Sequence, residues 1–207
     1  MLYFISAIIF SYIIGAIPTA YIFCRVIKGV DIRTVGSGNV GATNAMRVLG
    51  NVWGVTVLFL DVLKGVLPVT FLGNTLGSSL PVEQGELVRI ILGLSCICGH
   101  NWTIFLGFKG GKGVATTLGV LIGLAIAISG VRLVLGLVIV TWVLVFSIAR
   151  IVSMASVVSA IAFPFYLFLL KQSNILFYSG VIFSVFIIFR HKSNIKRLIK
   201  GEEKRLF

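Results

Sequence analysis

The stretch GSGNVGATNAMR, residues 36–47, holds the first group of residues whose types and spacing suggest chemistry. Its first three glycines have the G-x-G-x-x-G spacing of a dinucleotide-binding turn, namely Gly36, Gly38 and Gly41. That turn requires a preceding strand within a βαβ unit, whereas an apolar run and a charged turn precede this stretch. The alternatives are a re-entrant loop rich in turn and capping residues, or an anion site. In an anion site the exposed N–H groups of residues 36–41, the Ser37 hydroxyl and the Arg47 guanidinium would bind phosphate.

A second group, GHNWTIFLGFKGGKGVATT, covers residues 99–117. The Walker A loop is G-x-x-x-x-G-K-[ST], but from Gly107 this chain is one residue short and has Gly113 where the magnesium-holding Ser or Thr belongs. Its glycines still expose N–H groups before a new helix, whose N-terminus attracts anions. Lys109 and Lys112 add positive charge. A short basic turn is the simpler interpretation, yet such a turn needs only about one glycine.

The third group is the basic C-terminal stretch RHKSNIKRLIKGEEKRLF, residues 190–207. A juxtamembrane basic helix on anionic lipid accounts for most of its charge. His191 and Asn194 are three residues apart, which places them on one helix face at the edge of the last apolar run. A histidine side chain also titrates near neutral pH, so it suits proton transfer.

The rest of the chain must position these groups, and it is apolar enough to be a membrane protein. Of its 207 residues 58% are hydrophobic and 12% charged, with a mean hydropathy of +1.09, against about a quarter charged in soluble domains. We predict an all-α membrane protein with seven transmembrane helices in a single domain, 1–207. Arg150 alone separates the fifth run from the sixth, so five or six spans are alternatives. The predicted spans are about 1–24, with a kink at Pro18, then 52–72, 88–106, 113–129, 132–149, 151–170 and 175–190.

The distribution of Lys and Arg predicts the orientation of these spans. If the N-terminus lies outside, the outer loops hold only Arg89, Arg132 and Lys171, and most of the other cations fall on the cytoplasmic side together with the C-terminus. All three polar groups then lie on the cytoplasmic side, as short re-entrant or interfacial segments near the cytosolic loops. Three clusters on one side can converge on one site.

The six acidic residues do not pair in a way that suggests a metal site or an acid–base dyad. We therefore predict neither metal nor cofactor. Asp61 and Lys64, at positions i and i+3 inside an apolar run, are predicted to form an ion pair within the bundle. Cationic, glycine-rich loops beside hydrocarbon suit ligands that have a phosphate head and an acyl tail.

Taken together and in order, the blocks GSGNVGATNAMR, GHNWTIFLGFKGGKGVAT and RHKSNIKRLIKGEE resemble the bacterial acyl-phosphate:glycerol-3-phosphate acyltransferase family. The resemblance covers essentially the whole chain. It implies a multi-pass enzyme of the cytoplasmic (inner) membrane with seven helices and its active site on the cytosolic side. Such an enzyme transfers an acyl group from acyl phosphate to the 1-hydroxyl of sn-glycerol 3-phosphate, the first acylation step of phospholipid synthesis. The products are 1-acyl-sn-glycerol 3-phosphate (lysophosphatidic acid) and phosphate. The implied partner is a peripheral acyl-phosphate synthase that supplies the donor.

The resemblance also implies roles for individual residues. Glu202 is expected to be structural. Ser37, Arg47, His191 and Asn194 are the predicted catalytic residues. Substrate phosphate is predicted to bind at Gly36, Gly38, Asn39, Gly41, Thr43, Asn44, Lys109, Gly110, Gly111, Lys112 and Gly113.

For the chemistry we predict direct acyl transfer with Ser37 as a hydrogen-bond donor, because no evident base would activate Ser37 as a nucleophile. Electrostatic stabilisation and positioning would carry much of the rate. The hydroxyl proton goes either to His191 or to a substrate phosphate. One rival function is a small-anion transporter. The position of the clusters at one surface and the lack of a visible inverted repeat in the sequence argue against it. The other is a nucleotide-dependent kinase, and the lack of paired magnesium ligands argues against that.

Overall fold

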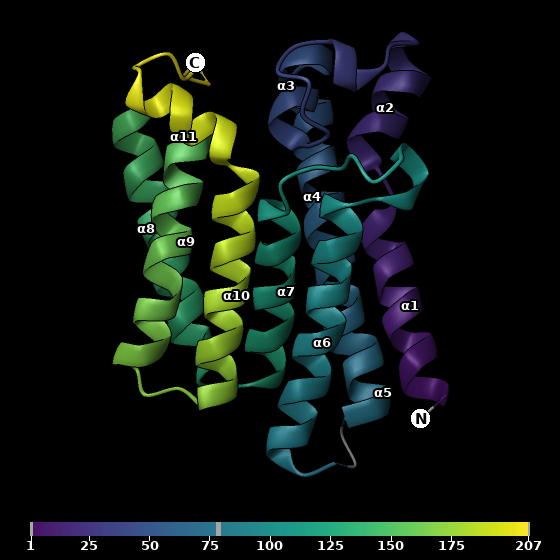
Figure 1. Cartoon of the computed structure of the whole chain (residues 1–207), viewed down its shortest axis with the longest axis vertical. Coiled ribbons are helices and arrows are strands. Elements are labelled where there is room, and N and C mark those ends of the chain that lie inside the picture. Colours follow the sequence, from purple (N-terminus) through teal and green to yellow (C-terminus); the bar gives the residue numbers. More distant parts are fainter. Residues whose placement is uncertain (1, 78–79, 207) are drawn as a thin grey trace. The chain divides into compact units, whose positions relative to one another are not determined.

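A computed structural model describes residues 2–77 and 80–206, and within them every regular element is helical (Figure 1). Two short elements, η1 and η3, are 3-10 helices and η2 is a π-helix. In chain order the elements are α1 (Leu2–Ala16), α2 (Thr19–Lys28), η1 (Ile32–Thr34), α3 (Ala42–Leu49), α4 (Asn51–Leu67), η2 (Pro68–Leu72), α5 (Gly73–Gly77), α6 (Val82–Asn101), η3 (Ile104–Leu106), α7 (Val114–Ala127), α8 (Val131–Ala149), α9 (Val152–Leu169), α10 (Asn174–Arg190) and α11 (Lys192–Ile199).

Each of the seven predicted apolar runs is largely helical, which confirms an all-helical membrane protein, and the short helices α3, α5 and α11 lie outside those runs. Helices α10 and α11 are bent by 64° at their junction. If they form one broken span, it adds a sixth candidate membrane span, by length and composition, to the five given at the end of this paragraph. Helix α7 has 14 residues, about 21 Å at 1.5 Å per residue, which is short for a hydrocarbon layer of about 30 Å. Five stretches of the described residues are long and apolar enough to cross a bilayer on their own, namely Leu2–Lys28, Asn51–Gly77, Val82–Leu106, Val131–Ala149 and Val152–Leu169.

The chain divides into two compact units, one ending at Leu124 and the other beginning at Ala125. In the first unit α1 packs along α6. Their backbones approach at glycines: a Cβ at Gly15 would lie 2.0 Å from the carbonyl oxygen of Cys96, and one at Gly99 would lie 2.1 Å from that of Tyr12. Ser11 Oγ donates to the Leu92 carbonyl oxygen at 2.6 Å in the same interface. In lipid the hydrophobic effect does not drive helices together, so they associate through close packing at small residues and through interhelical hydrogen bonds.

The first predicted span is interrupted as expected at Pro18, which lies between α1 and α2. Proline lacks an N–H and cannot continue the hydrogen-bond ladder of a helix. The interruption leaves the Ile17 carbonyl oxygen to accept a hydrogen bond from Lys64 Nζ at 3.0 Å. The break therefore creates a polar position inside an apolar run.

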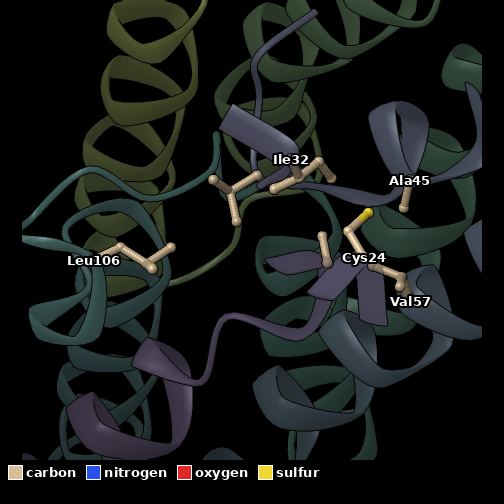
Figure 2. Packing of buried hydrophobic residues seen from close by; sticks show 7 residues of the cluster. Cys24, Ile32, Ala45, Val57 and Leu106 are labelled. Carbon is tan, nitrogen blue, oxygen red and sulfur yellow. The ribbon is translucent and has the colours of Figure 1, made fainter. Parts of the chain in front are cut away.

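At one end of the first unit, α2, α3 and the segment after α6 enclose a small apolar core. Figure 2 shows its members from several elements, including Cys24 of α2, Ala45 of α3, Val57 of α4 and Leu106 of η3. Val40, from the first glycine-rich block, belongs to the same cluster. This core therefore holds the first and second polar blocks together.

In the second unit α9 packs against α8 on one side and α10 on the other. Arg150 and Ile151 connect α8 to α9, and Arg150 lies in the left-handed region with φ of 60°. The 132–170 region is thus two helices. Thr141 Oγ1 and the Tyr166 hydroxyl lie 2.7 Å apart across α8 and α9, and Ser184 Oγ donates to the Ala160 carbonyl oxygen at 2.6 Å across α10 and α9.

Candidate active site

The first block folds around one buried amide, Asn44, which is fully enclosed near the start of α3. Asn44 Oδ1 accepts a hydrogen bond from the Ser37 N–H at 2.8 Å. Its Nδ2 donates to three carbonyl oxygens of the preceding loop at 3.0–3.2 Å, those of Ile32, Val35 and Asn39. A buried amide with all of its groups engaged inside the chain shapes the loop, so Asn44 holds the first block in its conformation. Its contact with phosphate stays a prediction.

Three of the backbone N–H groups at residues 36–41, where we predict an anion site, are engaged within the loop. The N–H of Ser37 is held by Asn44, that of Gly38 donates to the Val35 carbonyl oxygen at 3.1 Å, and that of Gly41 donates to the Asn39 carbonyl oxygen at 3.1 Å. These donors close the loop on itself. These three N–H groups shape the loop, and the side chains of the block offer further donors for an anion.

Two side chains of the block are available to solvent. Ser37 lies in the loop and Arg47 lies in α3, and both are exposed. Asn39 and Thr43 are half-buried beside them in the chain. An exposed guanidinium offers five donors in a planar fork that matches a phosphate. Arg47 is therefore the strongest candidate anion ligand of this block.

The acidic residue that precedes the first block does not suit proton transfer. Asp31 caps η1 and pairs with Arg33, whose Nη2 lies 2.7 Å from Asp31 Oδ2. Hydrogen bonds from the Arg33 side chain and backbone lower the pKa of Asp31 to about 2. The carboxylate is therefore ionised at any pH near neutrality, and it neutralises one of the cations near the site.

The glycine loop of the second block folds back onto the end of α6. The N–H of Gly110 donates to the Asn101 carbonyl oxygen at 3.2 Å, and that of Gly111 donates to the His100 carbonyl oxygen at 3.0 Å. Both N–H groups cap the C-terminus of α6, and the binding of phosphate at these two glycines stays a prediction. Lys109 is exposed, Lys112 is half-buried, and Gly113 has φ of 78° immediately before α7.

Gly111 is where the first and second blocks meet. A Cβ at this position would lie 2.2 Å from His100 Nε2 and 2.6 Å from the Val40 carbonyl oxygen. No side chain fits into that space without displacing the loop. The predicted convergence of these two blocks is thus found within the first unit.

Gly111→Ala is expected to lower the activity of this site by about 100-fold, because a shift of about 1 Å in positioning groups has that effect. Overpacking should also cost about 1–3 kcal/mol of stability. Activity and the thermal unfolding midpoint in detergent measure both effects. Gly136→Ala is the matched control, since a Cβ there meets nothing within 4 Å and the midpoint should hold or rise. Wild-type activity in Gly111→Ala would contradict the packing described.

A buried polar network lies inside the first unit, near Gly111. Asp61 is 1% exposed and Lys64 is 6% exposed. The predicted ion pair between them is confirmed, with Lys64 Nζ 2.8 Å from Asp61 Oδ1. Thr19 Oγ1 donates to the same carboxylate oxygen at 2.6 Å, and His100 Nδ1 lies 3.8 Å from it.

The sequence interpretation missed the two other members of this network, Thr19 and His100. A cavity of about 10 Å³, lined among others by Thr19, Lys64, His100 and Gly111, adjoins it and has room for about one water molecule. The available signal was the presence of ionisable residues inside an apolar span, which are costly and usually functional. The network places His100 between a buried carboxylate and the glycine loop.

Three more buried polar side chains of the second block were not predicted. Asn101 Oδ1 and Nδ2, Thr116 Oγ1 and Thr117 Oγ1 have no hydrogen-bond partner among the described residues. A Cβ at Gly113 would lie 2.7 Å from Asn101 Oδ1, so the amide is next to the start of α7. Unpaired buried polar groups are rare in proteins and mark places where a water or ligand completes the pairing.

The third block belongs to the second unit. His191 ends α10 and Asn194 lies in α11, with His191 2% exposed and Asn194 4% exposed. His191 Nδ1 lies 2.8 Å from the Ile187 carbonyl oxygen. Because a carbonyl only accepts, Nδ1 carries a proton, and in the neutral ring Nε2 is the nitrogen able to accept one.

The structural glutamate of this block is Glu203, whereas Glu202 was predicted. Glu202 is exposed, and its backbone N–H donates to the Arg197 carbonyl oxygen at 2.8 Å. Glu203 accepts side-chain hydrogen bonds from Ser153, Asn194 and Arg197 at 2.5–2.7 Å. Burial alone raises the pKa of Glu203, but the bonds from Asn194, Ser153 and Arg197 outweigh it, and the net pKa lies below its usual value.

Comparisons with known proteins agree with this architecture over nearly the whole chain. The glycerol-3-phosphate acyltransferase family profile matches residues 5–201. A glycerol-3-phosphate acyltransferase of Fusobacterium nucleatum subsp. nucleatum is 42% identical over 98% of this chain and 97% of its own. One from Chlorobaculum parvum is 40% identical over 100% of this chain and 97% of its own.

Two crystal structures of PlsY (YgiH), an integral membrane glycerol 3-phosphate acyltransferase, have the same fold. The glycerol 3-phosphate form is 37% identical with a TM-score of 0.85, covering 98% of this chain and 94% of that one. The lysophosphatidic acid form is 36% identical with a TM-score of 0.82 and the same coverage. With a matching profile over 5–201 and relatives of 40–42% identity, the chain belongs to the glycerol-3-phosphate acyltransferase family and is an integral membrane protein with multiple spans.

Proposed function

We propose that this chain transfers the acyl group of acyl phosphate to the 1-hydroxyl of sn-glycerol 3-phosphate and releases 1-acyl-sn-glycerol 3-phosphate and phosphate. The observation that carries the proposal is its likeness, over 98% of its length, to an enzyme solved in a glycerol 3-phosphate form and a lysophosphatidic acid form. The exposed cations beside the two glycine blocks support it. Lysophosphatidic acid synthesis is the first acylation of phospholipid assembly.

Phosphate binding is assigned to side chains more than to backbone. Arg47 and Ser37 are exposed in the first block, and Lys109 is exposed in the second. Two phosphate-bearing substrates repel each other, so cations that approach both lower the energy of bringing them together. Among the predicted ligands, Gly36, Gly38, Gly41, Gly110 and Gly111 act by letting the loops approach closely. Asn39, Thr43, Lys112 and Gly113 remain candidate phosphate ligands.

The proposed reaction is a direct displacement. The 1-hydroxyl oxygen attacks the acyl carbon, the bond from that carbon to the phosphate oxygen breaks, and phosphate leaves with the electron pair. The hydroxyl proton passes to His191 Nε2 or to a substrate phosphate oxygen. Ser37 donates a hydrogen bond and is not acylated, and Arg47, His191 and Asn194 complete the catalytic set.

In the membrane we propose seven spans in one domain, 1–207, with the N-terminus outside and the C-terminus in the cytoplasm. The family profile supports one domain because it runs through both units. Helix α7 completes the seven if its N-terminal loop lies within the membrane boundary, which suits a re-entrant glycine loop. The site then faces the cytosol at the bacterial inner membrane, where a peripheral acyl-phosphate synthase delivers the donor.

Sealed proteoliposomes with radiolabelled glycerol 3-phosphate outside test this function against small-anion transport. Label should enter the lipid fraction as lysophosphatidic acid, and only when acyl phosphate is present. Empty liposomes with the same additions are the control. Soluble label in the lumen without acyl phosphate would instead make the chain a transporter.

A further inference from the structure

The buried carboxylate of Asp61 contacts side chains from three helices of the first unit. Its Oδ1 lies 2.8 Å from Lys64 Nζ, accepts from Thr19 Oγ1 at 2.6 Å and lies 3.8 Å from His100 Nδ1. Thr19 begins α2, Lys64 lies in α4 with Asp61, and His100 lies near the end of α6. A buried ion pair is weak evidence for a role in stability, because apolar replacements are often neutral or stabilising. Ionisable groups within a membrane span usually have a function.

His100 is the member of this cluster that reaches the glycine loop, residues 107–113. Its carbonyl oxygen accepts from the Gly111 N–H at 3.0 Å, and a Cβ at Gly110 would lie 2.0 Å from the same oxygen. Its ring faces the loop as well, since a Cβ at Gly111 would lie 2.2 Å from Nε2. The cluster and the loop also line the same cavity, which includes Thr19, Lys64 and both glycines. A movement of the imidazole would therefore move the loop.

We propose that Asp61 and His100 are positioning residues for the glycine loop: the carboxylate orients the imidazole, and the imidazole fixes the loop that presents Lys109 and Lys112 to a phosphate of the substrate. This inference rests on the proposed function and deepens it. Asp61 is 1% exposed and His100 is 8% exposed, so both act through the loop and do not touch the substrate.

The geometry makes the acceptor oxygen of Asp61, more than its charge, the feature that matters. The 3.8 Å contact between Nδ1 and Oδ1 is longer than a direct hydrogen bond, so it acts by orienting the ring. A carboxylate only accepts, and the ring therefore turns a protonated Nδ1 toward Asp61 and its Nε2 toward Gly111. An amide oxygen in the same place would orient the ring in the same way, whereas an apolar side chain would not.

Two double variants that differ only in this oxygen test the proposal. One combines Asp61→Asn with Lys64→Met, and the other combines Asp61→Leu with Lys64→Met. Neither keeps an unpaired ion, and asparagine and leucine have the same branched shape, so both thermal midpoints should return toward wild type. The variant with Asp61→Asn should have kcat/KM for glycerol 3-phosphate close to wild type. The variant with Asp61→Leu should be about 100-fold lower, as expected for a loop displaced by about 1 Å.

Hydrogen exchange of the backbone N–H groups in peptides covering 107–113 reads the loop without any substrate. Exchange should be faster with Asp61→Leu and unchanged with Asp61→Asn, because the loop opens locally when the ring is no longer held. His100→Asn, which leaves the ion pair in place, should also speed exchange in this loop. Equal loop exchange in the two double variants would overturn the proposal, whatever their activities.

Cys96→Ala is the control for lost stability. Cys96 is fully buried and its thiol donates to the Lys64 carbonyl oxygen at 3.1 Å, away from the Asp61 carboxylate. This change should lower the midpoint but leave loop exchange and kcat/KM as in wild type. If it lowers kcat/KM as much as Asp61→Leu does, stability and not loop position sets the rate, and the proposal is wrong. Unequal loop exchange in the double variants, with no lysophosphatidic acid from wild type, would keep this contact and remove the proposed function.

Discussion

Replacing Arg47 by alanine is expected to reduce lysophosphatidic acid formation by about 10²–10³-fold, the loss typical of removing one preorganised donor to developing charge. Arg47 is exposed on α3, three residues beyond the buried Asn44 that holds the neighbouring loop. Its fork of donors suits a phosphate, and a lysine reproduces the charge but not the fork. Arg47→Lys should therefore recover only part of the activity. Initial rates at saturating and subsaturating glycerol 3-phosphate measure both.

Lys204→Ala is the control for charge, because it removes one cation from an exposed position in the tail. It should change the rate less than twofold. Equal losses in Arg47→Ala and Lys204→Ala would mean that net charge, and not the Arg47 contact, sets the rate. Full activity in Arg47→Ala would remove Arg47 from the site.

The largest effect on stability is expected at Asp61. Asp61→Ala leaves Lys64 buried with its carbonyl partner but without its counter-ion. Breaking a buried pair in this way costs about 3–5 kcal/mol, or roughly 10 °C in thermal midpoint for a chain of this size. The loss should extend to activity, because His100 lies between Asp61 and the glycine loop.

The double variant Asp61→Leu with Lys64→Met separates the two effects. Replacing both charges by apolar side chains removes the unpaired ion, so the midpoint should return toward wild type. Activity should stay low if the carboxylate positions His100. A single Asp61→Ala variant with an unchanged midpoint would contradict the buried ion pair.

Helix positions were predictable because apolar runs of membrane length leave the backbone no alternative to helix. The interruptions at Pro18 and Arg150 were also predictable, because each of these residues breaks an otherwise continuous apolar run. The ion pair of Asp61 and Lys64 followed from their spacing on one helix. All of these features are determined by residues that are close together in the sequence.

Features that depend on distant neighbours were not predictable. The sequence shows glycines and asparagines in the first block, but not that Asn44 uses its whole amide to close the loop. It shows His100 but not its approach to Asp61, which comes from another helix. Glu202 and Glu203 are adjacent and chemically identical, and only the path of the chain after α11 decides which one turns inward.

We expect the protein to transfer the acyl group directly from acyl phosphate to glycerol 3-phosphate. The most direct measurement is a single turnover of purified protein in lipid, with labelled acyl phosphate and glycerol 3-phosphate, a metal chelator and no coenzyme A. We predict lysophosphatidic acid and phosphate in equal amounts, with no acyl label on the acid-quenched protein. Absence of lysophosphatidic acid, or acyl label recovered on Ser37, would contradict this mechanism.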